Sequence, residues 1–490
     1  MQRVFDRMVP WLLRYGILPV LLALYGAVGF TSLGYDDEFF NINLITQAHF
    51  SFARVWQLAE HMDVHPPLSY MLDLALFKLL GSWPLVRMAS GWLVALSLVY
   101  AINHVRKLHG DKAGVWAFIL LGLNPSLLLW GASLRWYTPF VAVLLWLSVI
   151  PAEKKPLWLW LRMYAGLLVL GYMNYSTVLL ALPVFILYWR ADGRPWRQKL
   201  PLVAGMGVVV LLLYLYQLNA FFQVHFLNRE HQIFSLFANV YGYGIAQLGN
   251  QGLFPVSVAG MVAIAGGSIL SLLSVYEQRL ALTKNRYLGS YVLGVLFFLA
   301  SGIAGKIRNY VVLSPWQGLW LTTSLHGSKR KIVHVGLAMV LIGNLVGLYN
   351  VAAHEDTSKS GWNVPHRQAL EVIKTQWKLC AEPSMIATYD PVMVWHLREE
   401  GYPVVNLLNQ PVDMLKRQLN CLVFIKTFAG SMTDAKMAGI RKTLDGLNRD
   451  DVTTIVLGLD RHAAFKHRLD PRYGQYGIVL EVMQGVDVGR

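Results

Sequence analysis

The chain has 490 residues, of which 55% are hydrophobic and only 14% are charged, and its mean hydropathy is +0.42. Ordinary soluble domains are about 45–50% apolar and about 25% charged, so this composition excludes a water-soluble globular protein. The formal net charge of +15 does not indicate nucleic-acid binding, because the basic residues lie mostly between apolar runs and form no basic stripe interleaved with aromatic residues.

Long apolar runs recur from the amino terminus to about residue 350. Runs of about 17–25 residues are typical of transmembrane helices. Basic clusters such as Arg106-Lys107 and Lys329–Lys331 lie in loops that recur on alternate sides of successive apolar runs. By the positive-inside rule, this pattern places the amino terminus in the cytoplasm. It also favours contact with anionic lipid. The sequence therefore predicts an α-helical polytopic membrane protein with about 11 transmembrane helices, near residues 10–33, 84–104, 113–131, 137–151, 157–173, 174–190, 201–220, 253–275, 287–304, 310–325 and 331–350.

Two loops are too long to be simple connections. The first, residues 34–82, contains amphipathic stretches such as residues 50–58, which predict short helices along the outer membrane surface. The second, residues 221–252, contains His225, Arg229 and the run Tyr241–Gly244. Long loops that resemble neither linkers nor disordered segments are usually functional, so both are expected to contribute to a site.

From about Ala352 the hydrophobic stretches shorten to the length of strands. Residues 421–425 and 453–457 read as strands, and residues 364–377 read as a helix. We therefore expect residues 1–350 to form the transmembrane domain and residues 351–490 to form a small soluble α/β domain outside the cytoplasm. This domain has no Walker or Rossmann glycine fingerprint, and both a capping role and acceptor recognition remain open for it.

The two cysteines, Cys380 and Cys421, both lie in this last domain. An oxidising compartment outside the cytoplasm permits a disulfide between them. A pair of cysteines does not by itself show that they are close, so two buried free thiols remain the alternative.

Three acidic residues, Asp36, Asp37 and Glu38, directly follow the first apolar run. Acidic residues so close to hydrocarbon are costly and are kept mainly where they face a polar cavity or have partners. The alternative is an ordinary solvated cluster in a loop.

Basic and aromatic residues recur at the outer ends of the predicted spans. Two guanidinium groups and a lysine that converge there opposite acidic residues suit the phosphate of a lipid carrier, with a general base nearby. Taken alone, each arginine reads as a snorkelling anchor. The residues concerned are His65 before a double proline, Arg135-Trp136-Tyr137, and Lys306-Ile307-Arg308-Asn309-Tyr310.

The order of these motifs resembles that of the GT-C glycosyltransferases, in particular the branch of protein O-mannosyltransferases and lipid A aminoarabinose transferases. The resemblance covers roughly residues 11–350, and the order and spacing are more specific than any single motif. It rests on Asp36-Asp37-Glu38, His65–Tyr70, Leu85–Ser90, Asn124-Pro125, Arg135–Tyr137 and Arg308–Tyr310.

The resemblance implies an inverting transfer of a sugar from a polyprenyl-phosphate donor on the outer face of the membrane. It assigns the general base to Asp37, with Asp36 as a one-residue alternative, and gives Glu38 a role in orienting groups near the acceptor. Arg87 is expected to be structural. The implied donor-phosphate contacts are His65, Arg135, Tyr137, Lys306, Arg308 and Tyr310.

The leaving phosphate does not require a metal once its charge is matched, although a divalent cation bound by the acidic cluster remains open. We expect a cell-envelope lipid or glycan as acceptor, at the bacterial inner membrane, because the short carboxyl-terminal domain differs from the β-trefoil-type insertion of protein mannosyltransferases. A protein acceptor is the alternative. A lipid-linked sugar flippase is a second alternative, but the sequence shows no internal repeat and no mid-span charges. A scaffold without activity is a third.

Overall fold

The structure is a computed structural model, and it divides the chain into two compact units. The first, here the helical unit, comprises Met1–Ser32 and Leu44–Ala353. The second, here the sheet unit, comprises Leu33–Asn43 and His354–Arg490. The structure describes residues 12–34, 36–62, 66–150, 156–174, 176–225, 240, 242–278, 285–301, 307–355, 357, 365–407, 415, 418–427, 434–448, 451–459 and 476–488.

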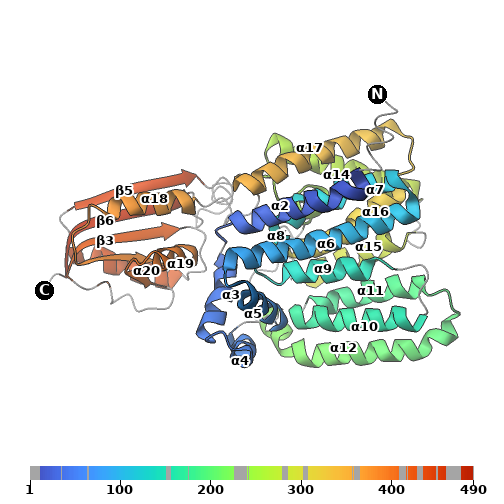
Figure 1. Ribbon diagram of the computed structural model, residues 1–490, viewed down its shortest axis with the longest axis horizontal. Coiled ribbons are helices and arrows are strands. Elements are labelled where there is room, and N and C mark those ends of the chain that lie inside the picture. Colours follow the sequence, from blue (N-terminus) through green and yellow to red (C-terminus); the bar gives the residue numbers. More distant parts are fainter. Residues whose placement is uncertain are drawn as a thin grey trace. The chain divides into compact units, whose positions relative to one another are not determined.

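Helices make up the described part of residues 12–353, and Figure 1 shows α10, α11 and α12 lying side by side. Three short helices, α3, α4 and α5, occupy most of the first long loop, as its amphipathic pattern predicted. The elements are η1 (Leu12–Gly16), α2 (Ile17–Thr31), α3 (Asp36–Gln47), α4 (Phe52–Met62), α5 (Leu68–Leu80), α6 (Trp83–His109), α7 (Asp111–Ala117), η2 (Phe118–Gly122), α8 (Pro125–Gly131), α9 (Tyr137–Ser148), α10 (Pro156–Met173), α11 (Thr177–Ala191), α12 (Trp196–His225), η4 (Gly244–Leu248), α14 (Val258–Glu277), α15 (Arg286–Ser301), η6 (Ile307–Leu313), α16 (Ser314–Leu325) and α17 (Lys331–Ala353).

Each apolar run that the sequence predicted to span the membrane coincides with one of these helices or with a broken helix. Among the described residues, however, only α6, α14 and α17 are by themselves long and apolar enough to cross a membrane. The bent pair formed by residues 111–122 and 125–131 would make a fourth span. The count of eleven spans therefore stays a prediction.

The run predicted as one continuous span at 113–131 is broken at Asn124-Pro125, where the two halves differ in direction by 53°. The side chain of Asn124 accepts hydrogen bonds from the amides of Ser126 (2.9 Å) and Leu127 (3.3 Å), so it caps a new helix. Pro125 has no amide hydrogen to continue the preceding helix. These two residues therefore cause the break, and α8 runs in a different direction from the helix before it.

Small residues bring α2 and α6 together, and the two helices lie side by side in Figure 1. A Cβ atom on Gly91 would lie 2.6 Å from the carbonyl oxygen of Tyr25, which is closer than real Cβ atoms come to a backbone oxygen. At the end of α2, Arg87 is buried and donates a hydrogen bond of 3.2 Å to the carbonyl oxygen of Ser32. This contact agrees with the structural role expected for Arg87.

The sheet unit contains a mixed sheet of six strands in the described chain, with the order β2-β1-β3-β6 and with β5 and the short β4 also paired to β6. The first three strands run parallel, and β6 is antiparallel to its neighbours. The predicted strands at 421–425 and 453–457 and the predicted helix at 364–377 are confirmed. The elements are α18 (His366–Trp377), β1 (Ser384–Thr388), α19 (Pro391–Glu399), β2 (Val404–Asn406), β3 (Leu419–Thr427), α20 (Asp434–Asp445), β4 (Leu447–Asn448), β5 (Asp451–Leu459) and β6 (Tyr476–Val488).

Both faces of this sheet are buried, which requires helices on each side. Side chains alternate along β3, with Val423 and Ile425 facing the core that α18 and α19 share. Leu422 and Phe424 face the other core, to which α20 contributes Ile440. The unit is therefore a three-layer α/β arrangement with its own hydrophobic cores.

A buried histidine–aspartate contact fixes the beginning of α19. The carboxylate of Asp390 accepts hydrogen bonds from the amides of Val392 (2.8 Å) and Met393 (3.1 Å), and His366 Nε2 donates to its other oxygen at 3.0 Å. Burial alone raises the pKa of the Asp390 carboxyl, but His366 and the Met393 amide outweigh burial and hold this pKa below its ordinary value. The charged carboxylate thus caps α19 and ties it to α18.

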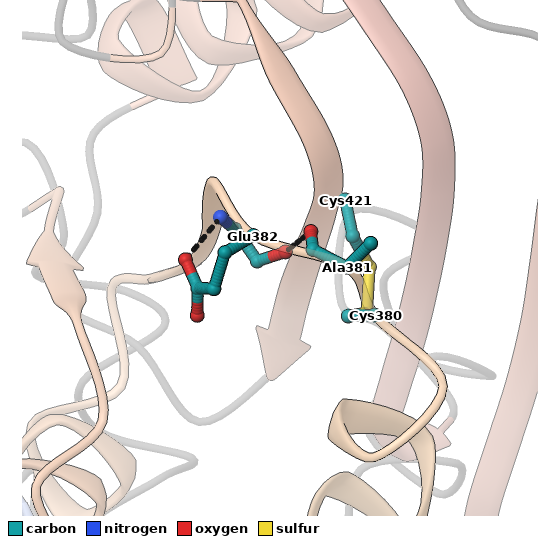
Figure 2. The surroundings of a disulfide bond; sticks show 5 residues. Cys380, Ala381, Glu382 and Cys421 are labelled. Carbon is teal, nitrogen blue, oxygen red and sulfur yellow. Dashed lines mark hydrogen bonds between the residues drawn. A yellow bond between two sulfur atoms is a disulfide. The ribbon is translucent and has the colours of Figure 1, made fainter.

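Cys380 and Cys421 form a disulfide, with their Cα atoms 5.4 Å apart (Figure 2). The bond joins the segment before β1 to β3. Figure 2 also shows Glu382, whose carboxylate accepts a hydrogen bond of 2.9 Å from the amide of Ser384, and this bond orders the same turn. Of the two alternatives left open by the sequence, the structure shows the disulfide.

We expect the double substitution Cys380→Ser and Cys421→Ser to lower the free energy of unfolding of the sheet unit by about 4 kcal/mol, because a cross-link over 41 residues restricts the unfolded chain. Pulse proteolysis of the full protein in increasing urea, read on peptides of β3 and β6, measures this change. Reduction of the wild type should reproduce the loss. Equal stability of the oxidised, reduced and substituted proteins would contradict the expectation.

Candidate active site

The acidic cluster lies in the first turn of α3, one of the short helices of the first long loop. Gly34 precedes it with a φ of 84°, a left-handed conformation that favours glycine and turns the chain into the helix. Carboxylates in a first helical turn are stabilised by the helix dipole. Glu38 is fully buried, while the side chains of Asp36 and Asp37 lie outside the described residues.

The candidate phosphate contacts are distributed over several segments of the helical unit. Arg135, Tyr137 and Tyr310 are all buried. Arg308 belongs to η6, but its side chain is not among those described. The predicted contacts His65 and Lys306, and residues 226–239 and 241 of the second long loop, lie outside the described residues.

Arg135 and Tyr137 lie where the chain turns between α8 and α9. Thr138 Oγ1 donates to the carbonyl oxygen of Ser133 (2.6 Å), and Ser133 Oγ donates to that of Trp130 (2.7 Å). These bonds satisfy carbonyl groups that the interrupted helices leave without an intrahelical partner. Arg135 is therefore presented from a hydrogen-bonded, buried turn.

The two segments with an arginine beside a tyrosine meet, although 172 residues separate them. Tyr137 Oη donates a hydrogen bond of 3.3 Å to Asn309 Oδ1. Asn309 directly follows Arg308 and precedes Tyr310 in η6. The structure thus joins Arg135–Tyr137 and Arg308–Tyr310 into one cluster, here called the arginine–tyrosine cluster.

Tyr310 is fully buried among aromatic rings. Its ring centroid lies 6.1 Å from that of Tyr243 and 6.0 Å from that of Phe298. Tyr243 in turn shares a hydrogen bond of 3.1 Å with the hydroxyl of Tyr291. Within the described part of the chain, the buried Tyr310 hydroxyl has no hydrogen-bond partner, and such a group is costly unless a ligand or water reaches it.

Glutamine side chains that the sequence analysis did not single out hold η6 in place. Gln247 Nε2 donates to the carbonyl oxygen of Tyr310 (2.6 Å) and, at 3.4 Å, to Ser314 Oγ. Gln317 Nε2 donates to the carbonyl oxygen of Gln247. Because η4 and η6 are not regular α-helices, side-chain amides replace part of their backbone hydrogen bonding in an apolar setting.

A third glutamine, Gln251, ties α8 to the same region. Gln251 Oε1 accepts a hydrogen bond of 2.5 Å from Trp130 Nε1, and the amide of Gln251 donates to Ser126 Oγ at 2.7 Å. In the sequence, the available signal for these contacts was that the glutamines lie beside apolar runs. Only the folded chain shows which partners they bind.

The described part of the chain contains no group of three or more histidine, cysteine, aspartate or glutamate residues that could hold a metal ion. The side chains of Asp36 and Asp37 do not belong to this described part. The divalent cation considered from the sequence therefore stays a hypothesis about the acidic cluster.

No family model and no curated protein sequence matches the chain. Two crystal structures of ArnT from Cupriavidus metallidurans are similar to it. The apo structure aligns with a TM-score of 0.50 at 11% sequence identity, over 96% of this chain and 98% of ArnT. The structure bound to undecaprenyl phosphate aligns with a TM-score of 0.49 at 12% identity, over 95% and 97% of the two chains.

Because the sequence identity is only 11%, the similarity to the apo structure establishes the fold alone. The alignment extends over nearly the whole of both chains. The chain therefore has the fold of ArnT, and its apolar helices are those of a membrane protein.

Proposed function

We propose that this protein is an inverting glycosyltransferase that moves a sugar from a polyprenyl-phosphate donor to a hydroxyl group of a cell-envelope lipid or glycan. The arginine–tyrosine cluster carries this proposal. Two basic segments predicted to contact one phosphate are joined by the Tyr137–Asn309 hydrogen bond, in a chain with the fold of ArnT.

A lipid phosphate suits this cluster for chemical reasons. Guanidinium groups bind phosphate through paired hydrogen bonds, and a buried site strengthens these bonds. The buried hydroxyl of Tyr310 supplies a further donor. ArnT, which shares the fold, has also been crystallised with undecaprenyl phosphate, which supports a polyprenyl phosphate as the carrier.

In the proposed reaction, the carboxylate of Asp37 removes the proton from the acceptor hydroxyl while its oxygen attacks the anomeric carbon. The new glycosidic bond forms as the bond from the anomeric carbon to the phosphate oxygen breaks, and the electron pair of that bond leaves with the polyprenyl phosphate. Direct displacement inverts the anomeric configuration. Arg135, Arg308 and His65 would neutralise the leaving phosphate.

We place the reaction on the outer face of the membrane. The disulfide between Cys380 and Cys421 supports this placement, because disulfides persist in oxidising compartments and are rare in the cytosol. The basic loops predicted on the cytoplasmic side agree with it. A bacterial inner membrane with the site facing the periplasm fits both features.

The test is turnover of a panel of polyprenyl-phosphate sugars by the full protein in nanodiscs, with an envelope extract as acceptor. Release of polyprenyl phosphate with formation of a glycosylated envelope lipid or glycan supports the proposal. Mass spectrometry of the products identifies the acceptor. A glycosylated protein among the products would show that the acceptor is a protein. Transfer of labelled donor across a vesicle membrane without turnover would favour a flippase.

A further inference from the structure

We propose that α19 of the sheet unit is a positioning element for the acidic cluster, acting through His396 and Trp395. The inference rests on the proposed function, because it gives the carboxyl-terminal domain a part in that reaction. Neither a simple cap for the membrane helices nor a domain that only recognises the acceptor would need the contacts described below.

The first observation is that the chain segment with the acidic cluster packs with the carboxyl-terminal domain. From the sequence, residues 34–43 were expected to belong to the transmembrane domain. In the structure, Leu33–Asn43 forms one compact unit with His354–Arg490. The acidic residues are therefore held by contacts with residues more than 300 positions later in the sequence.

A hydrogen bond anchors the segment on the amino-terminal side of the acids. His396 Nε2 donates to the carbonyl oxygen of Leu33 at 3.2 Å. Leu33 lies just before the turn at Gly34, where the chain has no regular secondary structure to hold its carbonyl group. The histidine thus fixes the backbone immediately before α3 begins.

An aromatic contact anchors the segment on the carboxyl-terminal side of the acids. Phe39 is fully buried, and its ring centroid lies 6.1 Å from that of Trp395 and 5.8 Å from that of His396, with an edge-on arrangement to the histidine. Such pairs stabilise a defined ring geometry in addition to burying apolar area. Because Leu33 and Phe39 bracket Asp36, Asp37 and Glu38, two successive residues of α19 hold both ends of the acidic turn.

A positioning element must itself be rigid, and α19 is. Asp390 caps its first turn, and His366 donates a buried hydrogen bond of 3.0 Å to the carboxylate of Asp390. Its inner face contributes Met393 and Leu397 to the core shared with α18. A general base displaced by about 1 Å can lose about 100-fold in rate, so a rigid support next to the base has a large effect on turnover.

The experiment compares wild type with His396→Ala and His396→Gln in the full protein. We expect His396→Ala to lower kcat for polyprenyl-phosphate release about 10- to 100-fold, with the KM for the donor within about 2-fold, because the donor contacts lie elsewhere in the sequence. His396→Gln keeps a side-chain donor and should restore most of kcat. Glu399→Ala, an exposed change on the same helix, is the matched control and should behave as wild type.

Hydrogen–deuterium exchange provides a readout that does not depend on activity. In His396→Ala, amides of the first turns of α3 should exchange about 10-fold faster, while β3 and β6 keep their protection and so show that the sheet unit is folded. Unchanged exchange, or an unchanged kcat in an active protein, would overturn the positioning role. If wild type proves inactive with every donor, the proposed function fails, and the exchange experiment still decides whether α19 holds the acidic turn.

Discussion

Replacing Asp37 by asparagine is expected to lower the release of polyprenyl phosphate by about 10³-fold, because the amide cannot accept the proton of the acceptor hydroxyl. The substitution keeps the size of the side chain and leaves the arginine–tyrosine cluster intact. Donor affinity should therefore stay within about 2-fold of wild type, so that the loss appears in kcat. Single-turnover kinetics with a radiolabelled donor, together with direct binding of the donor in nanodiscs, separate the two quantities.

Two further variants make this experiment specific. Asp36→Asn tests the neighbouring acid, and a larger loss there than at Asp37 would move the general base by one residue. Asp111→Asn changes an exposed aspartate at the start of another helix, α7, and is expected to leave turnover unchanged. Full activity of both Asp36→Asn and Asp37→Asn would show that neither aspartate accepts the proton of the acceptor hydroxyl.

Replacing Arg135 by glutamine is expected to weaken binding of a polyprenyl phosphate about 10- to 100-fold. A hydrogen bond to a charged group contributes about 1.5–3 kcal/mol, and glutamine retains polarity but neither the charge nor the paired geometry. Arg135→Lys should recover only part of the affinity, since a lysine binds phosphate as a point charge. Equilibrium binding of labelled undecaprenyl phosphate to the protein in nanodiscs measures both effects.

A double-mutant cycle with Arg308→Gln tests whether the two arginines share one phosphate. The Tyr137–Asn309 hydrogen bond places their backbone segments together, so we expect the combined loss to differ from the sum of the single losses. Arg54→Gln, at an exposed position of α4, is the matched control for loss of a positive charge. Strict additivity, or an equal loss from Arg54→Gln, would mean that general charge and not a shared contact determines donor binding.

The two sets of variants probe different steps of the reaction. A general base acts only once the acceptor hydroxyl attacks, so its loss lowers kcat. Phosphate contacts act on the bound donor and on the leaving group, so their loss affects affinity as well as rate. A protein that only translocates the donor would lose function in the arginine variants and keep it in the aspartate variants.

Much of the local structure could be predicted from the sequence. Apolar runs form helices in a membrane protein because every backbone polar group must be satisfied within the segment, so the positions of the helices follow from hydropathy. The strands at 421–425 and 453–457 and the helix at 364–377 could be located because strands and helices bury side chains with different periods. The order of the motifs also indicated the GT-C fold.

Tertiary structure alone decided which of these local elements meet. Hydropathy shows that Tyr137 and Asn309 lie at the ends of apolar helices, but their hydrogen bond depends on how those helices pack. The same holds for Gln247 and the carbonyl group of Tyr310. The sequence likewise allowed a disulfide between the two cysteines without placing them side by side.

The sequence by itself determined that this protein is a membrane protein with an acidic cluster after its first apolar helix and a small α/β domain at its carboxyl-terminal end. Only the tertiary structure decided that residues 33–43 pack with that domain, through Phe39 and His396. The physical reason is that burial patterns report how much of a side chain is covered and at which period. They do not report which distant residue covers it, because that choice depends on the packing of the whole chain.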